Sequence, residues 1–203
     1  MTIRSGMTEL IRLIRQLAQA EDGEYEVAGE TYWQDEHLQD VLDVFRTDVY
    51  EESIYPVPQF ISGATVYQNY YWENPNVERA DSGTAIWQLR NMNGEAIGTA
   101  NYSVDYPARR IRFGTPTDGS WCALNYSVYD INRAAAEVWR RKAANVANRF
   151  DIKTDNHDLK RNQLRQNYLD MAKYYEGLAQ QGSGNGGSSA GRMKEMVRSD
   201  LNG

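Results

Sequence analysis

Few side chains in this sequence belong to the types that most often act as nucleophiles, proton carriers or soft metal ligands. There are two histidines, His37 and His157, and one cysteine, Cys122. His37 stands in an acidic stretch, but its spacing matches no zinc motif. A single cysteine excludes an internal disulfide and a cysteine-based zinc site. We therefore predict no catalytic residue, no metal site, no cofactor and no enzyme activity. We interpret His37 as a solvated helix residue, His157 as part of a helix start and Cys122 as a small buried strand residue.

Two segments resemble ligand-binding motifs, and their contexts argue against both. Gly182, Gly184 and Gly187 satisfy the spacing of a dinucleotide-binding loop. That motif needs a strand before it and a helix directly after it, whereas here it follows a predicted helix and lies in a Gly/Ser run. Residues 151–162 faintly match a calcium loop, but Lys153 replaces a ligand and the twelfth residue is Asn rather than Glu. Neither segment predicts a site.

The composition is that of a mixed-charge protein without a membrane segment. The chain has 203 residues, enough for one domain with an insertion or for two small domains. No apolar run approaches the length that spans a membrane. Arg12 and Arg15 interrupt the apolar residues near the N-terminus, so no secretory signal is predicted. We expect synthesis in the cytoplasm and no membrane partner.

Charge is distributed unevenly along the chain. Residues 1–60 carry a net charge of −9, whereas residues 61–203 carry +3. A head-to-tail contact between copies could use this asymmetry. The alternative reading, solvated helix faces of an ordinary soluble protein, is equally compatible with the pattern.

Residues 129–150 give the longest uninterrupted helix signal. Apolar residues recur there at three- and four-residue steps, and Asp130 can cap the start. Its many alanines allow close approach, so we expect neighbours on more than one side: other helices of this chain and a second copy. The alternative is a core helix of a monomeric bundle.

Three further segments have helical patterns. An amphipathic helix is predicted over Thr8–Ala20, and a second follows Trp33 as far as Arg46. A helix over His157–Gln181 would form an antiparallel hairpin with residues 129–150. Pro56 and Pro58 are expected to end helical structure.

The middle of the chain has strand character. Most of the 14 tyrosines lie between Tyr50 and Tyr129, and turn residues such as Asn93-Gly94 and Asp118-Gly119 punctuate this part of the chain. We predict about five antiparallel strands, at Thr65–Trp72, Thr84–Leu89, Ala100–Val104, Arg110–Phe113 and Trp121–Tyr126.

Together these patterns predict an α+β fold. We expect an antiparallel bundle of about four helices with a small inserted antiparallel β-sheet and an extended C-terminal tail. The expected segments are residues 1–58 for the N-terminal helices, 59–127 for the sheet, 128–181 for the C-terminal helical hairpin, 182–191 for a Gly/Ser linker and 192–203 for a docking tail. The tail would present one apolar face of a short helix. Its predicted partner-binding residues are Arg192, Met193, Met196, Val197 and Leu201.

The order of these features resembles the head–tail connector (adaptor) proteins of long-tailed bacteriophages, over about residues 8–180. The segments that carry the resemblance are Tyr32-Trp33-x-Asp35-x-x-Leu38-Gln39-x-x-Leu42-Asp43, Arg46-x-Asp48-Val49-Tyr50, Pro56-x-Pro58, Arg110-Ile111-Arg112-Phe113, Tyr129-Asp130-x-x-x-Ala134-Ala135-Ala136-x-x-Trp139, Ala143-Ala144, Phe150-Asp151-x-Lys153-Thr154-Asp155-Asn156-His157, Gln163 and Tyr168-x-x-Met171-Ala172. Gln34 departs from the Ser often found before the acidic residues, which affects a helix cap.

The resemblance implies a structural virion protein. Such proteins form rings, usually of twelve copies, between the capsid portal and the next neck or tail protein, and double-stranded DNA passes through the ring without being read. We assign contacts between copies to Arg133, Arg140, Arg141, Asp40 and Asp43. We assign contacts with another ring to Tyr67, Tyr70, Tyr71 and Trp72.

Other classes remain open. A stopper or tail-terminator ring protein would have less helix and a dominant barrel. A glycan- or small-molecule-binding module on the Tyr/Trp-rich sheet would be a monomer with a concave aromatic pocket.

Overall fold

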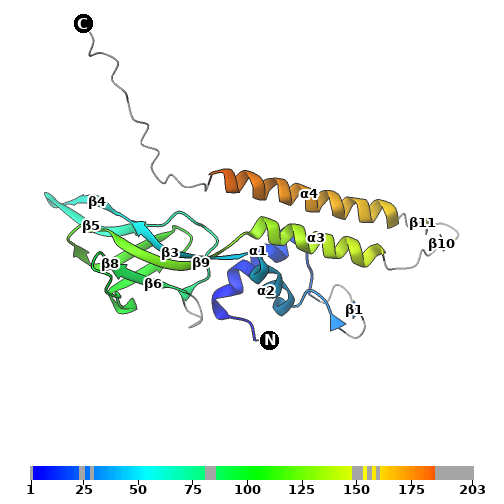
Figure 1. The fold of residues 1–203 in the computed structure, drawn as a ribbon, viewed down its shortest axis with the longest axis horizontal. Coiled ribbons are helices and arrows are strands. Elements are labelled where there is room, and N and C mark those ends of the chain that lie inside the picture. Colours follow the sequence, from blue (N-terminus) through cyan, green and yellow to red (C-terminus); the bar gives the residue numbers. More distant parts are fainter. Residues whose placement is uncertain are drawn as a thin grey trace, which may run out of the picture.

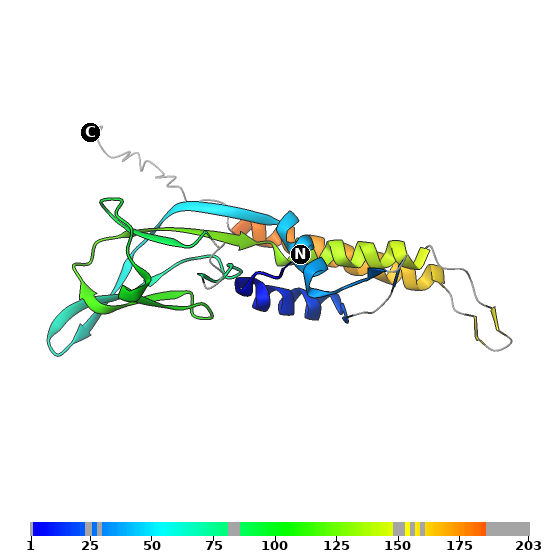
Figure 2. The same ribbon diagram turned by 90° about the horizontal axis from the view of Figure 1, so that it is seen from below.

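The computed structural model describes residues 2–22, 26–27, 30–80, 86–147, 153–154, 157–158 and 161–185. The described chain forms an elongated body with strands at one end and helices at the other (Figures 1 and 2). Two short antiparallel pairs lie outside the main sheets: β1 (Glu26–Val27) with β2 (Glu30–Thr31), and β10 (Lys153–Thr154) with β11 (His157–Asp158).

The prediction of a helical bundle with a small inserted sheet is wrong, because strands occupy far more of the chain. Seven described strands form two antiparallel sheets in the orders β3-β9-β6 and β4-β5-β8-β7. Their bounds are β3 Arg46–Ile54, β4 Pro56–Ile61, β5 Ala64–Tyr71, β6 Gln88–Asn91, β7 Tyr102–Asp105, β8 Arg110–Thr117 and β9 Cys122–Tyr129. The β part therefore begins at Arg46, well before the expected boundary at residue 59.

Two strands in the supposed helical region account for most of this difference. Strand β3 contains a register shift between Val49 and Glu52, which breaks the two-residue alternation that would have marked it as a strand. Strand β4 contains Pro56 and Pro58, which have no N–H to donate. It lies at the edge of its sheet, where proline is tolerated.

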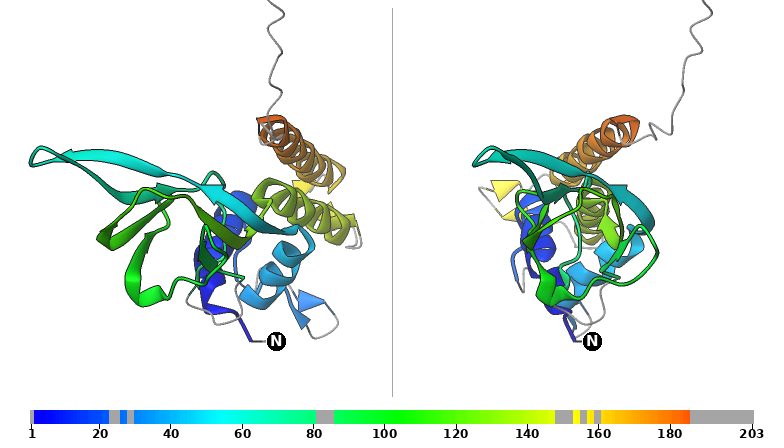
Figure 3. Two further views of the ribbon diagram at one scale, coloured as in Figure 1. Left: turned by 60° about the vertical axis from the view of Figure 1, so that its left-hand side comes forward. Right: turned by 90° about the vertical axis from the view of Figure 1, so that its left-hand side faces the viewer.

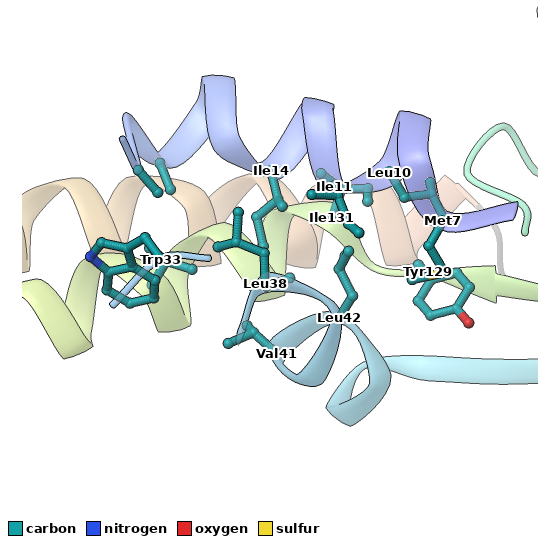
Figure 4. Close-up of a cluster of buried hydrophobic side chains, with 14 residues drawn as sticks. Met7, Leu10, Ile11, Ile14, Trp33, Leu38, Val41, Leu42, Tyr129 and Ile131 are labelled. Carbon is teal, nitrogen blue, oxygen red and sulfur yellow. The ribbon is translucent and has the colours of Figure 1, made fainter. Parts of the chain in front are cut away.

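The N-terminal helices pack where the sequence placed them. Helix α1 (Thr8–Ala18) and helix α2 (Asp35–Val44) lie against α3 (Ile131–Ala147) around one apolar cluster (Figure 4). Trp33, at the start of α2, is 1 % exposed within this cluster. The expected cap by Asp130 is present, since its carboxylate accepts a hydrogen bond from the backbone N–H of Arg133 at 2.9 Å. Gln34 caps α2 with no side-chain hydrogen bond.

Helix α3 is covered on two sides by helices of its own chain. Helix α4 (Arg161–Asn185) lies along it as an antiparallel hairpin, while α1 and α2 lie across its other side (Figures 1 and 3). Ala135 and Ala136 face Ala172 and Tyr175 of α4, and these small side chains let the two backbones approach. The helices of this chain alone therefore account for the small side chains of α3. The expected second copy is not required to explain them.

A backbone crossing joins the helical part to the strand part. Residues 76–79 run between the end of β9 and the N-terminal segment. The N–H of Tyr129 donates to the carbonyl of Asn76 at 2.9 Å, and the N–H of Arg79 donates to the carbonyl of Gly6 at 3.2 Å. A Cβ at Gly6 would lie 2.4 Å from the Arg79 carbonyl oxygen, so only glycine allows this approach.

A buried ion pair fixes the same crossing. The Glu78 carboxylate is fully buried and accepts hydrogen bonds from Arg4 Nε at 2.8 Å and from the Tyr129 hydroxyl at 2.7 Å. The Arg4 guanidinium also donates two bonds to Asp43 on α2, at 2.9 and 2.5 Å. Burial raises the pKa of the Tyr129 hydroxyl, and its bond to Glu78 raises that pKa further, so the hydroxyl stays a donor.

We expect the Arg4→Ala substitution to lower the free energy of unfolding by about 3 kcal/mol, because it leaves a buried carboxylate without its cation. Urea unfolding followed by circular dichroism measures this loss. The matched control is Arg12→Ala, which removes only exposed contacts on the helix, with Glu9 and Gln16, and should cost less than about 1 kcal/mol. Equal losses in the two variants would contradict the assigned role of Glu78.

Candidate functional site

The most prominent surface feature is a projecting β-hairpin, β4–β5, which we call the arm (residues 55–71). It extends from the β part at the end of the molecule away from the helices (Figures 1–3). Ile61 pairs with Ala64, and the two turn residues, Ser62 and Gly63, have positive φ angles of 50° and 83°. This is the geometry of a tight two-residue hairpin turn.

The arm is both apolar and uncharged. Residues 53–72 contain no Asp, Glu, Lys or Arg, although a quarter of the chain is charged. Phe60 is 77 % exposed, and Tyr55, Val57, Ile61 and Tyr71 each exceed 40 %. Exposed strands at sheet edges usually carry charges that discourage association. An exposed apolar arm without such charges indicates a surface that another molecule covers.

The root of the arm is firmly anchored. Tyr70 is fully buried, and its hydroxyl bonds to Thr117 Oγ1 at 2.8 Å and to the Ser120 carbonyl at 2.9 Å. Its ring lies 5.2 Å from that of Phe113. The arm is therefore held in a defined direction rather than swinging about its base.

This burial changes the predicted contact surface. Tyr70 and Trp72 are 0 % and 3 % exposed, so neither can meet another protein, and Tyr67 is only half-exposed. Of the four residues assigned from sequence, Tyr71 alone is exposed. The exposed side chains Val57, Phe60 and Ile61 were missed, although the charge-free run that contains them was visible in the sequence.

An aromatic groove lies elsewhere on the β part. Its lining includes Trp87, Thr99, Tyr102, Val104 and Tyr106, and its volume is about 430 Å³. The rings of Trp87 and Tyr106 meet edge to face at 5.5 Å. The Arg79 guanidinium, at one side of the groove, lies 5.4 Å from the Tyr106 ring centroid. Burial raises the pKa of the Tyr102 hydroxyl, which therefore stays neutral. The groove can accept an apolar or aromatic group.

The arm and the groove lie at opposite edges of one sheet. Strand β4 is one edge of the order β4-β5-β8-β7, and β7, which supplies Tyr102 and Val104, is the other. Trp72, which follows β5 at the root of the arm, contacts the groove residues Trp87 and Tyr106, whereas the strands β5 and β8 separate β4 from β7 in the sheet.

The cations assigned to contacts between copies mostly have partners within this chain. Arg133 pairs with Asp130 at 3.3 Å, Arg141 pairs with Glu137 at 2.8 Å, and Arg140 pairs with Glu176 across the α3–α4 hairpin. A contact between copies through these residues would have to replace existing pairs.

The two assigned carboxylates differ in the same respect. Asp43 is held by Arg4, whereas Asp40 is exposed on α2. The five docking-tail residues, Arg192, Met193, Met196, Val197 and Leu201, lie outside the described residues. Helix α4 extends to Asn185, so it takes in the first residues of the expected linker.

The residues considered first for chemistry are dispersed. His37 is half-buried and stacks on Tyr32 with ring centroids 5.4 Å apart. Cys122 is buried in β9, as predicted. Within the described ranges, no group of three or more His, Cys, Asp or Glu residues is placed to hold a metal ion. The described helices also include none with the length and hydropathy needed to cross a membrane.

Comparison with known proteins identifies no family: no family model matches the chain, and no curated protein matches it either.

We expect the Cys122 thiol to be unreactive in the folded protein. We also expect it to make the free energy of unfolding fall as the pH rises in the alkaline range. Burial, with a smaller effect of the Asp118 charge, raises its pKa to about 11 from an ordinary value of 9.0. Below pH 9.0 both states carry a neutral thiol, and between these two values only the unfolded state ionises, so stability falls there by up to about 2–3 kcal/mol.

Urea unfolding between pH 8 and pH 11 measures this dependence, with Cys122→Ala as the comparison. The variant should lose less stability over that range, because it has no thiol that can ionise. The buried tyrosines are common to both proteins, so their contribution cancels in the comparison. Rapid reaction of the native thiol with a disulfide reagent at pH 8 would contradict its burial.

Proposed function

We propose that this protein is a ring-forming structural subunit of a bacteriophage neck, a head–tail connector between the capsid portal and the next neck or tail protein. The observation that carries the proposal is the uncharged apolar arm, which is anchored at its root and exposed from Val57 to Thr65. Such a surface suits a permanent protein contact. The resemblance in the order of segments over residues 8–180 supplies the identity of the assembly.

The distribution of charge supports a channel role. The first 60 residues carry a net charge of −9. An acidic face lining a lumen would repel phosphates and limit sticking of the DNA that passes through it. In this proposal, the protein is made in the bacterial cytoplasm and assembles into the virion as a ring, for which the resemblance implies twelve copies, and it performs no catalysis.

The helical part favours a connector over the other ring proteins considered. A stopper or tail terminator should be dominated by a barrel with little helix. Here α1, α2 and α4 surround α3, and this helical part accounts for much of the described chain. The aromatic groove supports a second candidate function, a glycan- or small-molecule-binding module. This alternative predicts a monomer that binds its ligand through Trp87, Tyr102 and Tyr106.

The first test is the mass of the purified protein, alone and with a capsid portal, by light scattering. We expect either a ring or a monomer that becomes a ring on the portal, since weak interfaces between copies gain from a template that aligns them. A monomer that ignores the portal would contradict the connector proposal. It would direct attention to a glycan screen against the groove.

The second test concerns the tail. We expect deletion of residues 186–203, which leaves α4 intact, to abolish or strongly weaken portal binding, because the apolar residues of the tail would dock there. The control replaces only residues 186–191 with another Gly/Ser sequence of equal length and should bind normally. Pull-down on immobilised portal measures both, and unchanged binding of the deletion would contradict a docking role.

A further inference from the structure

We propose that the arm of one copy docks into the aromatic groove of the next copy, with Phe60 as the central side chain. The inference rests on the proposed ring and names the contact that would build it. It also gives a use to two features of the β part: an apolar projection and an aromatic hollow.

The arm is suited to side-chain docking rather than strand addition. Pro56 and Pro58 remove two N–H groups from β4, whose outer edge is free in the sheet order. A neighbouring strand would find an interrupted set of donors there. Phe60 and Ile61, near the tip, are the groups that remain for a partner to bury.

The chemistry of the groove matches the arm. Its lining is aromatic and aliphatic apart from Thr99 and Arg79, and the arm carries no charge that would be buried without a partner. An aromatic side chain entering the groove would contact the rings of Trp87 and Tyr106, which already pair edge to face, and contacts between aromatic rings are favourable. The volume of about 430 Å³ leaves room for one large side chain and part of a second.

The placement of the two surfaces selects a second copy as the occupant. A projection at the β4 edge and a receptor at the β7 edge of one sheet make a heterologous, head-to-tail contact when copies associate. Such contacts generate closed rings when the rotation between neighbours closes. Each subunit in the ring then both inserts an arm and receives one.

The charges around the arm argue against nucleic acid or an anionic membrane as the occupant. Glu51, Glu52 and Glu73 flank the uncharged run, and no cation lies within it. Phosphate-bearing surfaces require cationic side chains, which the run itself lacks; the nearest cations, Arg110 and Arg112 of β8, lie opposite Tyr71 and Asn69 at its root, away from Phe60 and Ile61.

Cysteine cross-linking tests the contact directly. Phe60→Cys and Thr99→Cys are made separately and together, each in a Cys122→Ala background. The assembled protein, with portal added if assembly requires it, is oxidised and examined by non-reducing electrophoresis. We expect a dimer only when the two single variants are mixed, and a ladder of oligomers from the double variant.

Three results would overturn the inference. A disulfide dimer from Phe60→Cys alone would show a symmetric arm-to-arm contact. A ring of the expected mass without cross-links would refute the arm-in-groove contact while leaving the proposed function intact. Failure of any variant, and of the unmodified chain, to assemble with or without the portal would contradict both.

A complementary measurement uses polar substitution. Phe60→Ser should weaken self-association by about tenfold or more, given the apolar area that one phenylalanine buries. Val44→Ser is the matched control, since Val44 is 68 % exposed on α2, away from the arm, and its loss should leave association unchanged. Equal effects of the two variants, or no effect of Phe60→Ser, would refute the role of the arm.

Discussion

The arrangement of the two halves of this protein depends on the buried carboxylate of Glu78. It lies where the N-terminal segment, the 76–79 crossing and the end of β9 meet, and it is satisfied by Arg4 and by the Tyr129 hydroxyl. A buried charge of this kind tolerates little displacement of its partners, because a lost bond leaves the charge uncompensated. The bonds of Glu78 with Arg4 and Tyr129 therefore specify how the helices and strands meet. The apolar clusters on either side stabilise the fold by burying surface, but this contribution does not depend on direction.

The helical part and the strand part differ in how much of their surface the chain itself covers. The helical part is closed: α3 is covered by α1 and α2 on one side and by α4 on the other, and most assigned surface cations pair within the chain. The strand part presents an exposed apolar arm and an aromatic groove. The surfaces suited to contact other molecules therefore lie on the β part, rather than among the charges of the helices that the sequence analysis emphasised.

The sequence predicted the helices better than the strands, for physical reasons. Helix α1 was expected over Thr8–Ala20 and observed over Thr8–Ala18, because its apolar period is uninterrupted. Strand β3 was missed because its bulge breaks the alternation of sides, and β4 because proline excludes only central strands. The bond between Arg4 and Glu78 joins residues 74 apart and has no local signature. Exposure of the arm required knowing which faces of β4 and β5 lack a covering layer.

The connection between β9 and α3 has a mechanical consequence. Strand β9 ends at Tyr129 and α3 begins at Ile131, so Asp130 alone separates a sheet strand from the central helix. Its N–H is bonded to the Phe45 carbonyl, and its carboxylate caps the helix. A joint this short and this fully bonded cannot act as a hinge. Strand β9 and helix α3 therefore act as one stiff element, so the sheet β3-β9-β6 and the central helix keep a fixed direction relative to one another.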